Sequence, residues 1–322
     1  MYARPFTLLL LAAAATPGLW GDVTLRLHNT LKLGTVLPGP IADRTKAGMQ
    51  SPLPESTVRY RKGGQEYLQS GPFACLMDYD KQTITLIDGE HKQFATASMK
   101  DYAGRLRAAL PGVPEEYRWA ADASKVELSS RKTGRTDQMQ GVTVEETEFI
   151  ASIGVPAPDA NGVVHVQPVI RMTMQVWTAK SPDASKTAPV AELTAHRWPS
   201  PGFSEAIDPA SVLATIFGGM PGLGSGLRQM LEEVEKDGAV VLKAHLEAQM
   251  PGMADALRRV RTEQGQPLRG VDPDAPFAVM DTEVEAISGA SVDDQVFVLP
   301  KDYHAAPFED VLKAITPAVP KS

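Results

Sequence analysis

The sequence of 322 residues contains a single cysteine, so no disulfide can form within the chain. Its stability must therefore come from an ordinary hydrophobic core, which a mature chain of roughly 300 residues is long enough to build. The cysteine, Cys75, lies in the apolar stretch 73–77. This setting predicts a buried and unreactive thiol.

Clusters of basic residues are also absent. The formal net charge is −7, and no segment is dominated by lysine and arginine. Because phosphate backbones attract positively charged surfaces, this balance argues against nucleic acid as a partner. Beyond the amino-terminal segment, no apolar run reaches the length of about 20 residues that a membrane-spanning helix needs. We therefore expect a mature protein that does not span the membrane.

The amino-terminal segment, residues 1–21, has the layout of a secretory signal peptide. One positive charge at Arg4 precedes an unbroken apolar run over 6–15. Pro17 and Gly18 then interrupt the run well short of the length of a transmembrane helix. The sequence therefore predicts that the chain is exported.

Two positions fit cleavage of this segment. We favour Gly21, a small residue directly before the first strand-like segment, and Ala15 is the alternative. A lipid anchor would need a cysteine at the new amino terminus, where the sequence has none. We expect the mature protein to be periplasmic or secreted.

Strand patterns dominate the first part of the mature chain. Apolar residues alternate with polar ones over 23–33, which is typical of a half-buried antiparallel strand. Shorter strand-like runs follow at close intervals up to residue 94, and Asp88-Gly89 occupies a position suited to a tight turn. This spacing predicts a β-meander.

A helix and further strands follow the meander. Ser98 with Asp101 three residues later resembles a capping box and predicts a helix start there. Long strands are expected next, the longest over 163–177. Apolar residues at helical spacing, continued by Leu242, Leu246 and Gln249, predict a helical segment; they are Leu227, Met230, Leu231 and Val234. The closing strands are expected at 282–287 and 295–299, before a short terminal helix.

This order of elements predicts one α+β domain over 22–322, with a largely antiparallel sheet and helices covering one face. Two stretches interrupt the pattern and are interpreted as insertions. The first, 36–54, is polar and bracketed by prolines, and the second, 199–226, ends in a glycine-rich run.

Four local patterns resemble an uncharacterised family of exported bacterial proteins, similar in fold to the periplasmic carriers and acceptors of lipoproteins (LolA/LolB-type). They are Val-Arg-Tyr-Arg-Lys-Gly at 58–63, Met-Asp-Tyr-Asp-Lys-Gln at the start of 77–88, the basic and polar run 133–142, and Val-Phe-Val-Leu-Pro-Lys-Asp-Tyr at 296–303. Together they span most of the mature chain. The sequence departs from the family at 142–144, which lacks the aromatic residue and the cysteine often found there.

The resemblance implies a strongly curved antiparallel sheet that forms an incomplete β-barrel. In that fold, helices cover the concave face and can enclose an apolar cavity. Acyl chains are the ligands of the carriers that share it. A lipid or another hydrophobic ligand is therefore the ligand class that the resemblance implies.

Signatures of catalysis are not found in the sequence. Its six histidines show no pair at the helical spacing of a zinc-binding motif, and no Gly-x-Ser-x-Gly elbow occurs. The glycine-rich stretch 218–222 lacks the lysine of a phosphate-binding loop. We therefore predict no catalytic residue, no metal and no cofactor, and a protein that is not an enzyme.

The longest strand carries the candidate ligand-binding residues. Met172, Met174 and Val176 form an apolar line with Trp177 beside it, and methionine adapts to apolar ligands of varied shape. An ordinary core is the alternative interpretation of the same line. The leading functional hypothesis is thus a binding protein for a hydrophobic ligand, and the alternative is a structural protein of the cell envelope that engages a protein partner.

Overall fold

The structure is a computed structural model that describes residues 22–33, 55–109, 125–158, 161–179, 229–230, 233, 240–251 and 275–315. The predicted signal peptide and both insertions, at 36–54 and 199–226, lie outside these residues. The predicted cleavage sites also lie outside them.

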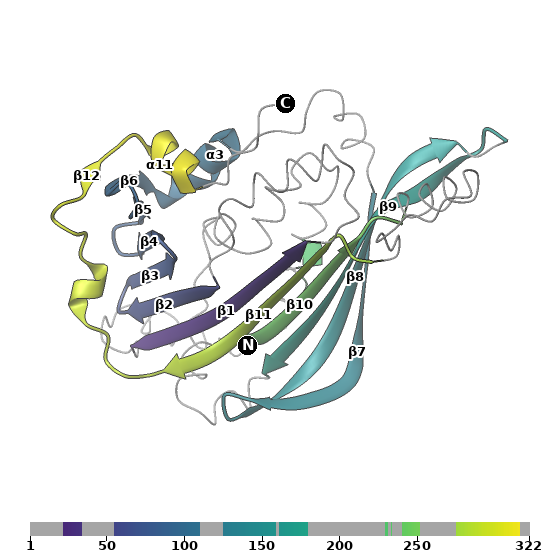
Figure 1. Ribbon diagram of the computed structural model, residues 1–322, viewed down its shortest axis with the longest axis horizontal. Helices are drawn as coiled ribbons and strands as arrows, with labels where there is room; N and C mark the ends of the chain where they lie inside the picture. Colours follow the sequence, from purple (N-terminus) through teal and green to yellow (C-terminus); the bar gives the residue numbers. More distant parts are fainter. Residues whose placement is uncertain are drawn as a thin grey trace, which may run out of the picture.

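Twelve strands form one sheet in the order β12-β6-β5-β4-β3-β2-β1-β11-β10-β9-β8-β7 (Figure 1). The strands are β1 (Val23–Leu33), β2 (Ser56–Lys62), β3 (Gln65–Ser70), β4 (Phe73–Asp78), β5 (Thr83–Asp88), β6 (Gln93–Ser98), β7 (Lys125–Met139), β8 (Val142–Pro158), β9 (Val164–Ala179), β10 (Val240–Gln249), β11 (Ala278–Ser288) and β12 (His304–Ala305). The other elements are helices α3 (Met99–Ala109) and α11 (Phe308–Ile315) and the 3-10 helix η1 (Asp294–Phe297).

Strand β1 lies inside the sheet, between β2 and β11. The meander β2 to β6 builds one half of the sheet, as its short strands and tight turns predict. The chain then continues at the opposite edge with β7 and returns through β8, β9 and β10 to β11. The amino-terminal strand thereby joins two halves that are each consecutive in sequence.

The two helices pack over one end of the sheet, beside β5 and β6 (Figure 1). Helix α3 begins with the predicted capping box: the amide of Asp101 donates to the Ser98 hydroxyl, 3.1 Å away. Tyr102 of α3 meets Phe308 of α11 edge to face, with ring centroids 5.8 Å apart. Both rings belong to a buried cluster with Cys75 and Leu86 of the sheet. Cys75 is fully buried, as its apolar surroundings predict.

The prediction of helices covering one face of the sheet is wrong. A helix is about 10 Å wide and neighbouring strands are about 4.8 Å apart, so one helix covers about two strands. The described helices therefore cover one end of a sheet of 12 strands. Among the described residues, the edge strands β12 and β7 are not paired with each other, and the sheet is open. It is also mixed, because β12 pairs with β6 in parallel.

Two further predictions of local structure are wrong. The segment predicted as helical around Leu242 and Leu246 is strand β10. Residues four positions apart share one side of a strand as well as one side of a helix, so their spacing alone could not separate the two structures. The expected closing strand at 295–299 is instead occupied by η1 and an extended segment.

We call residues 289–303 the strap. It leaves β11 near the middle of the sheet and reaches the far edge, where β12 pairs with β6 (Figure 1). It faces Tyr67 and Leu76, which alternate along β3 and β4 with the helix-facing Leu68 and Cys75. The strap therefore lies over one face of the meander, and the helices pack against the opposite face at β5 and β6.

Candidate functional site

A cleft lies between the strap and the outer face of strands β2 to β5. Its volume is about 480 Å³. Small-molecule sites usually have volumes of roughly 300–1,000 Å³, so the cleft is large enough for a small ligand. We call it the strap cleft.

Three tyrosines and Phe297 give the strap cleft its aromatic surface. Tyr60 of β2 and Tyr67 of β3 are cross-strand partners, with ring centroids 6.4 Å apart and planes tilted by 43°. Tyr303, at the end of the strap, lines the cleft as well. The sheet register and the strap thus bring together residues separated by more than 200 positions in the sequence.

The floor of the cleft is apolar and tightly built. Ala74 and Ile87, cross-strand partners on β4 and β5, are both buried. A side chain at Gly89 would place its Cβ 2.6 Å from the carbonyl oxygen of Pro72 and 3.3 Å from the Tyr303 hydroxyl. Glycine at position 89 therefore allows the β5–β6 turn to lie close to the β3–β4 turn and to Tyr303 of the strap.

The strap cleft carries no formal charge. No acidic or basic side chain occurs among the described residues that line it; its polar side chains come from tyrosine and glutamine. Burial, together with the neighbouring Tyr303 and Tyr60, raises the pKa of Tyr67. The Tyr67 hydroxyl therefore stays protonated at neutral pH and is able to donate a hydrogen bond.

Polar contacts fix both ends of the strap. At the first end, Asp22 accepts a hydrogen bond of 2.7 Å from the amide of Val292. At the second end, Lys92 of the β5–β6 turn forms a 2.8 Å ion pair with Asp302. The amide of His304 also donates to the carbonyl of Lys92. The wall of the cleft is therefore held independently on its two sides.

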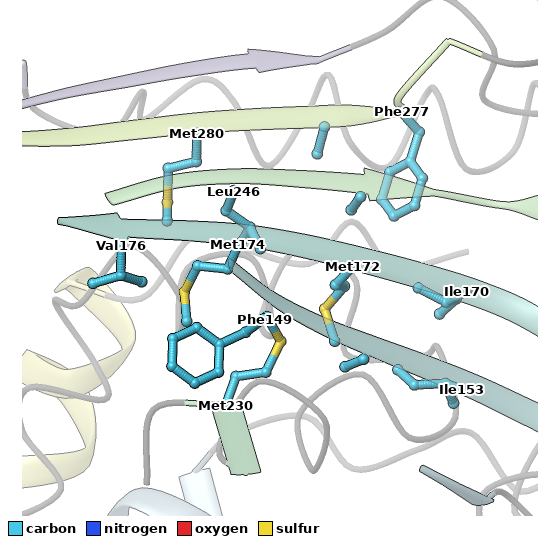
Figure 2. Packing of buried hydrophobic residues seen from close by; sticks show 13 residues of the cluster. Phe149, Ile153, Ile170, Met172, Met174, Val176, Met230, Leu246, Phe277 and Met280 are labelled. Atoms are coloured by element: carbon cyan, nitrogen blue, oxygen red, sulfur yellow. The ribbon is translucent and has the colours of Figure 1, made fainter. Parts of the chain in front are cut away.

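The predicted ligand-binding residues lie in a different part of the sheet. Met172, Met174 and Val176 point to one side of β9 and belong to a buried cluster with Phe149 and Met230 (Figure 2). Their side chains are at most 6% exposed. The structure thus brings these three residues together within a packed core cluster.

Trp177, the fourth predicted residue, is not part of that cluster. It packs against a third cluster, which contains Val144 and Leu242. Lys243 of β10 places its ammonium 5.7 Å from the centre of the indole ring, within the range of a cation–π contact. The structure therefore separates Trp177 from the methionine line.

The outer face of β10 and β11 carries a cluster of titratable groups. Nδ1 of His245 lies 2.6 Å from Asp281, and its Nε2 lies 3.2 Å from Glu247. Burial lowers the pKa of His245, but the hydrogen bonds to Asp281 and Glu247 outweigh this effect and raise it overall. In the described part of the chain, no group of three or more His, Cys, Asp or Glu side chains is arranged to hold a metal ion.

Two acidic residues of β8, Glu146 and Glu148, form ion pairs with arginines of β7. Glu146 lies 2.6 Å from Arg135, and Glu148 lies 2.7 Å from Arg131. The arginine lowers the pKa of Glu148 through its hydrogen bond. Both acids therefore serve the pairing of β7 with β8.

Comparison with protein families and with curated sequences finds no match. No protein-family model matches this chain, and no curated protein sequence matches it. None of the helices in the described ranges has the length and apolar character needed to cross a membrane. The site must therefore be interpreted from its own chemistry.

The sequence patterns did not predict the strap cleft, because its residues lie in strands that carry no recognisable binding motif. One signal could have indicated it: the run Phe73-Ala74-Cys75-Leu76-Met77 is apolar at every position. A strand with only one buried face alternates, whereas a strand covered on both faces does not. The run therefore indicates a second layer over the outer face, and the strap supplies that layer.

Proposed function

We propose that the protein is a non-enzymatic binding protein that works outside the cytoplasm and holds an uncharged ligand in the strap cleft. The strap cleft itself carries this proposal: it combines an apolar floor, three tyrosines and a volume suited to a small molecule. Binding sites typically combine apolar surface with a few polar groups that orient the ligand.

The uncharged cleft limits the ligand. Transferring a charged group out of water without a partner of opposite charge is costly, and the described lining supplies no such partner. The ligand therefore places an uncharged part with an apolar surface in the cleft. A hydrophobic ligand, expected from the sequence, meets this requirement, and the cleft replaces the methionine line as its proposed site.

Export is the second part of the proposal. It rests on the charge, apolar run and small residues of the first 21 positions. Expression in a bacterial host and sequencing of the mature amino terminus test it. A mature chain that begins at Asp22 is expected.

A variant that fills the cleft tests the binding function. Leu76 lines the cleft, so Leu76→Trp adds an indole to its interior. Arg26→Trp adds the same side chain to the exposed outer face of β1, outside the cleft, and serves as the control. Native mass spectrometry of protein purified from its own envelope should show a bound small molecule in the wild type and in Arg26→Trp. It should be lost in Leu76→Trp, and an unliganded wild type would contradict the proposal.

A second function, binding of an envelope protein, is supported by a different feature. The tip of the β8–β9 hairpin extends beyond the last residues paired with β7 and β10. On it, Val163, Val164 and Val166 are 53%, 64% and 41% exposed. Exposed apolar patches of this kind occur at protein interfaces. Crosslinking from position 164 in living cells, with position 26 as the control, should capture a protein only from the tip.

A further inference from the structure

The polar side chains of the strap cleft indicate which uncharged ligand it accepts. Five of them line it, from strands β2 and β3 and from the strap: Tyr60, Tyr67, Gln69, Gln295 and Tyr303. Within the described part of the chain, none of these side chains forms a hydrogen bond with another residue. Each therefore has hydrogen-bonding capacity available to a ligand.

These groups surround an apolar surface. Tyr67 and Gln69 point to the same side of β3, while Ala74 and Leu76, their partners on β4, form the floor. A pure acyl chain would leave these polar groups without partners as it displaced the water on them, which costs free energy. A ligand with an apolar face and hydrogen-bonding groups around its edge satisfies both parts of the lining.

We infer that the strap cleft binds an uncharged saccharide, with a sugar ring lying against the tyrosine rings and its hydroxyl groups bound by the tyrosine and glutamine side chains. This inference rests on the proposed binding function and names its ligand class. A sugar ring presents C–H groups on its face and hydroxyl groups at its edge. Tyrosine matches both, because it combines a large apolar ring with one polar group.

The arrangement of charges agrees with an uncharged ligand. The ion pairs of the strap lie at its ends, where Lys62 meets Asp294 and Lys92 meets Asp302. Each basic group there is already paired with a carboxylate. Uronic acids and amino sugars would therefore bring an uncompensated charge into the cleft, and we expect them to bind more weakly than their neutral counterparts.

The test is a calorimetric titration of the full exported chain with defined probes. Glucose, maltose, cellobiose and N,N′-diacetylchitobiose serve as neutral saccharides, with glucuronate and glucosamine as charged counterparts of glucose. N-phenyl-1-naphthylamine, whose fluorescence rises in apolar sites, reports binding of an uncharged apolar ligand. We expect at least one neutral saccharide to bind, and neither charged sugar to bind as tightly as glucose.

Variants test whether the saccharide binds in the strap cleft. Tyr67→Ala should weaken saccharide binding roughly tenfold, because it removes both the ring surface and the hydroxyl. Tyr67→Phe keeps the ring and should lose less. Arg26→Trp should bind as the wild type does. Unfolding temperatures of all variants establish that the differences do not come from loss of the fold.

Two results would overturn the inference, and they differ in what they mean for the proposed function. If N-phenyl-1-naphthylamine binds, Leu76→Trp abolishes its binding and no neutral saccharide binds, the ligand class is wrong but the binding function stands. If no probe binds and protein from the envelope carries no small molecule, both the ligand class and the binding function are wrong.

Discussion

Lys62 on β2 holds the strap through Asp294, with its ammonium nitrogen 2.8 Å from the carboxylate. The same ammonium donates to the carbonyl oxygen of Val292 at 2.6 Å. The hydrogen bond that Lys62 donates to Asp294 raises the pKa of Lys62, so the lysine remains charged at neutral pH. One side chain of the sheet thus contacts the strap on both sides of its first turn.

Loss of this contact should loosen the strap. Lys62→Met keeps the length of the side chain and removes its charge and its donors. We expect faster amide hydrogen exchange at Val292 and Val296, measured by mass spectrometry, and little change in the strands of the meander. Lys81→Met is the matched control, because Lys81 pairs with Asp78 within one turn and does not contact the strap. Equal exchange in the two variants would show that other contacts hold the strap.

The sequence predicted the meander and the start of α3 because both depend on local chemistry. Turn residues between short strands define the meander, and Ser98 with Asp101 defines the start of α3. The pairing of β1 with β11 could not be predicted from local sequence. It joins residues such as Leu31 and Met280, and nothing local in either strand selects the partner.

The strap and its cleft were unpredictable for a related reason. Val296 to Leu299 is apolar, and an apolar run of this length suits a buried strand as well as a segment packed on a sheet. Asp293 favours the packed segment over the strand, because its side chain accepts a hydrogen bond from the amide of Gln295 and starts a 3-10 turn. Which tyrosines meet the strap then depends on the whole order of the sheet.

Glu66 is expected to contribute strongly to stability. It is fully buried and accepts hydrogen bonds from the guanidinium groups of Arg59 and Arg61. Burial lowers the pKa of Arg61, and the Glu66 carboxylate opposes this effect by stabilising the charged guanidinium. Glu66→Gln leaves both arginines without a carboxylate and should lower the free energy of unfolding by about 3 kcal/mol.

Urea denaturation measures the effect of this substitution, and an exposed ion pair provides the comparison. Glu283 pairs with Lys243 at 3.0 Å, and about half of the Glu283 side chain is exposed. Glu283→Gln should change the free energy of unfolding by about 1 kcal/mol or less. Similar losses in the two variants would mean that burial does not distinguish the two carboxylates.

His245 should make stability depend on pH. Its pKa is raised in the folded state, so the folded protein binds the proton more tightly than the unfolded chain. The resulting stabilisation is fully present below the ordinary histidine pKa of about 6.5 and is lost as pH rises through the higher folded value. The stability difference between the wild type and His245→Gln should therefore shrink above neutral pH.

Denaturation of both proteins across this pH range measures the difference. The group is partly exposed, so the expected change is about 1 kcal/mol or less. Asp281→Asn removes the closer carboxylate and should lower the pKa of His245, which NMR titration of the imidazole can follow directly. An unchanged histidine titration in Asp281→Asn would contradict the assignment of the shift to this contact.

Cys75 should react with thiol reagents only when the protein unfolds. Its side chain is fully buried, and burial raises the pKa of the thiol well above its ordinary value, which disfavours the reactive thiolate. Labelling by 5,5′-dithiobis(2-nitrobenzoate) should be slow in buffer and complete in denaturant. Rapid labelling of the native protein would show that the helices α3 and α11 open away from the sheet.

Gly89 is expected to be required for the geometry of the strap cleft. Its amide donates to the carbonyl oxygen of Pro72 at 2.8 Å, and an added Cβ would lie only 2.6 Å from the same oxygen. Gly89→Ala must therefore shift the turn that carries Pro72 away from position 89, and the added Cβ also crowds the Tyr303 hydroxyl at 3.3 Å. We expect lower stability and weaker ligand binding than in the wild type.

Gly104→Ala supplies the matched control for this substitution. Gly104 lies within helix α3, where an added Cβ would meet no neighbouring atom of the described residues within 4 Å. Alanine favours a helix over glycine by about 1 kcal/mol, so this variant should be more stable than the wild type and bind ligand equally well. The same added methyl group should thus lower the stability of the protein at position 89 and raise it at position 104. If Gly89→Ala behaved like Gly104→Ala, the close approach of the β5–β6 turn to the β3–β4 turn would be wrong, and with it the shape of this end of the cleft.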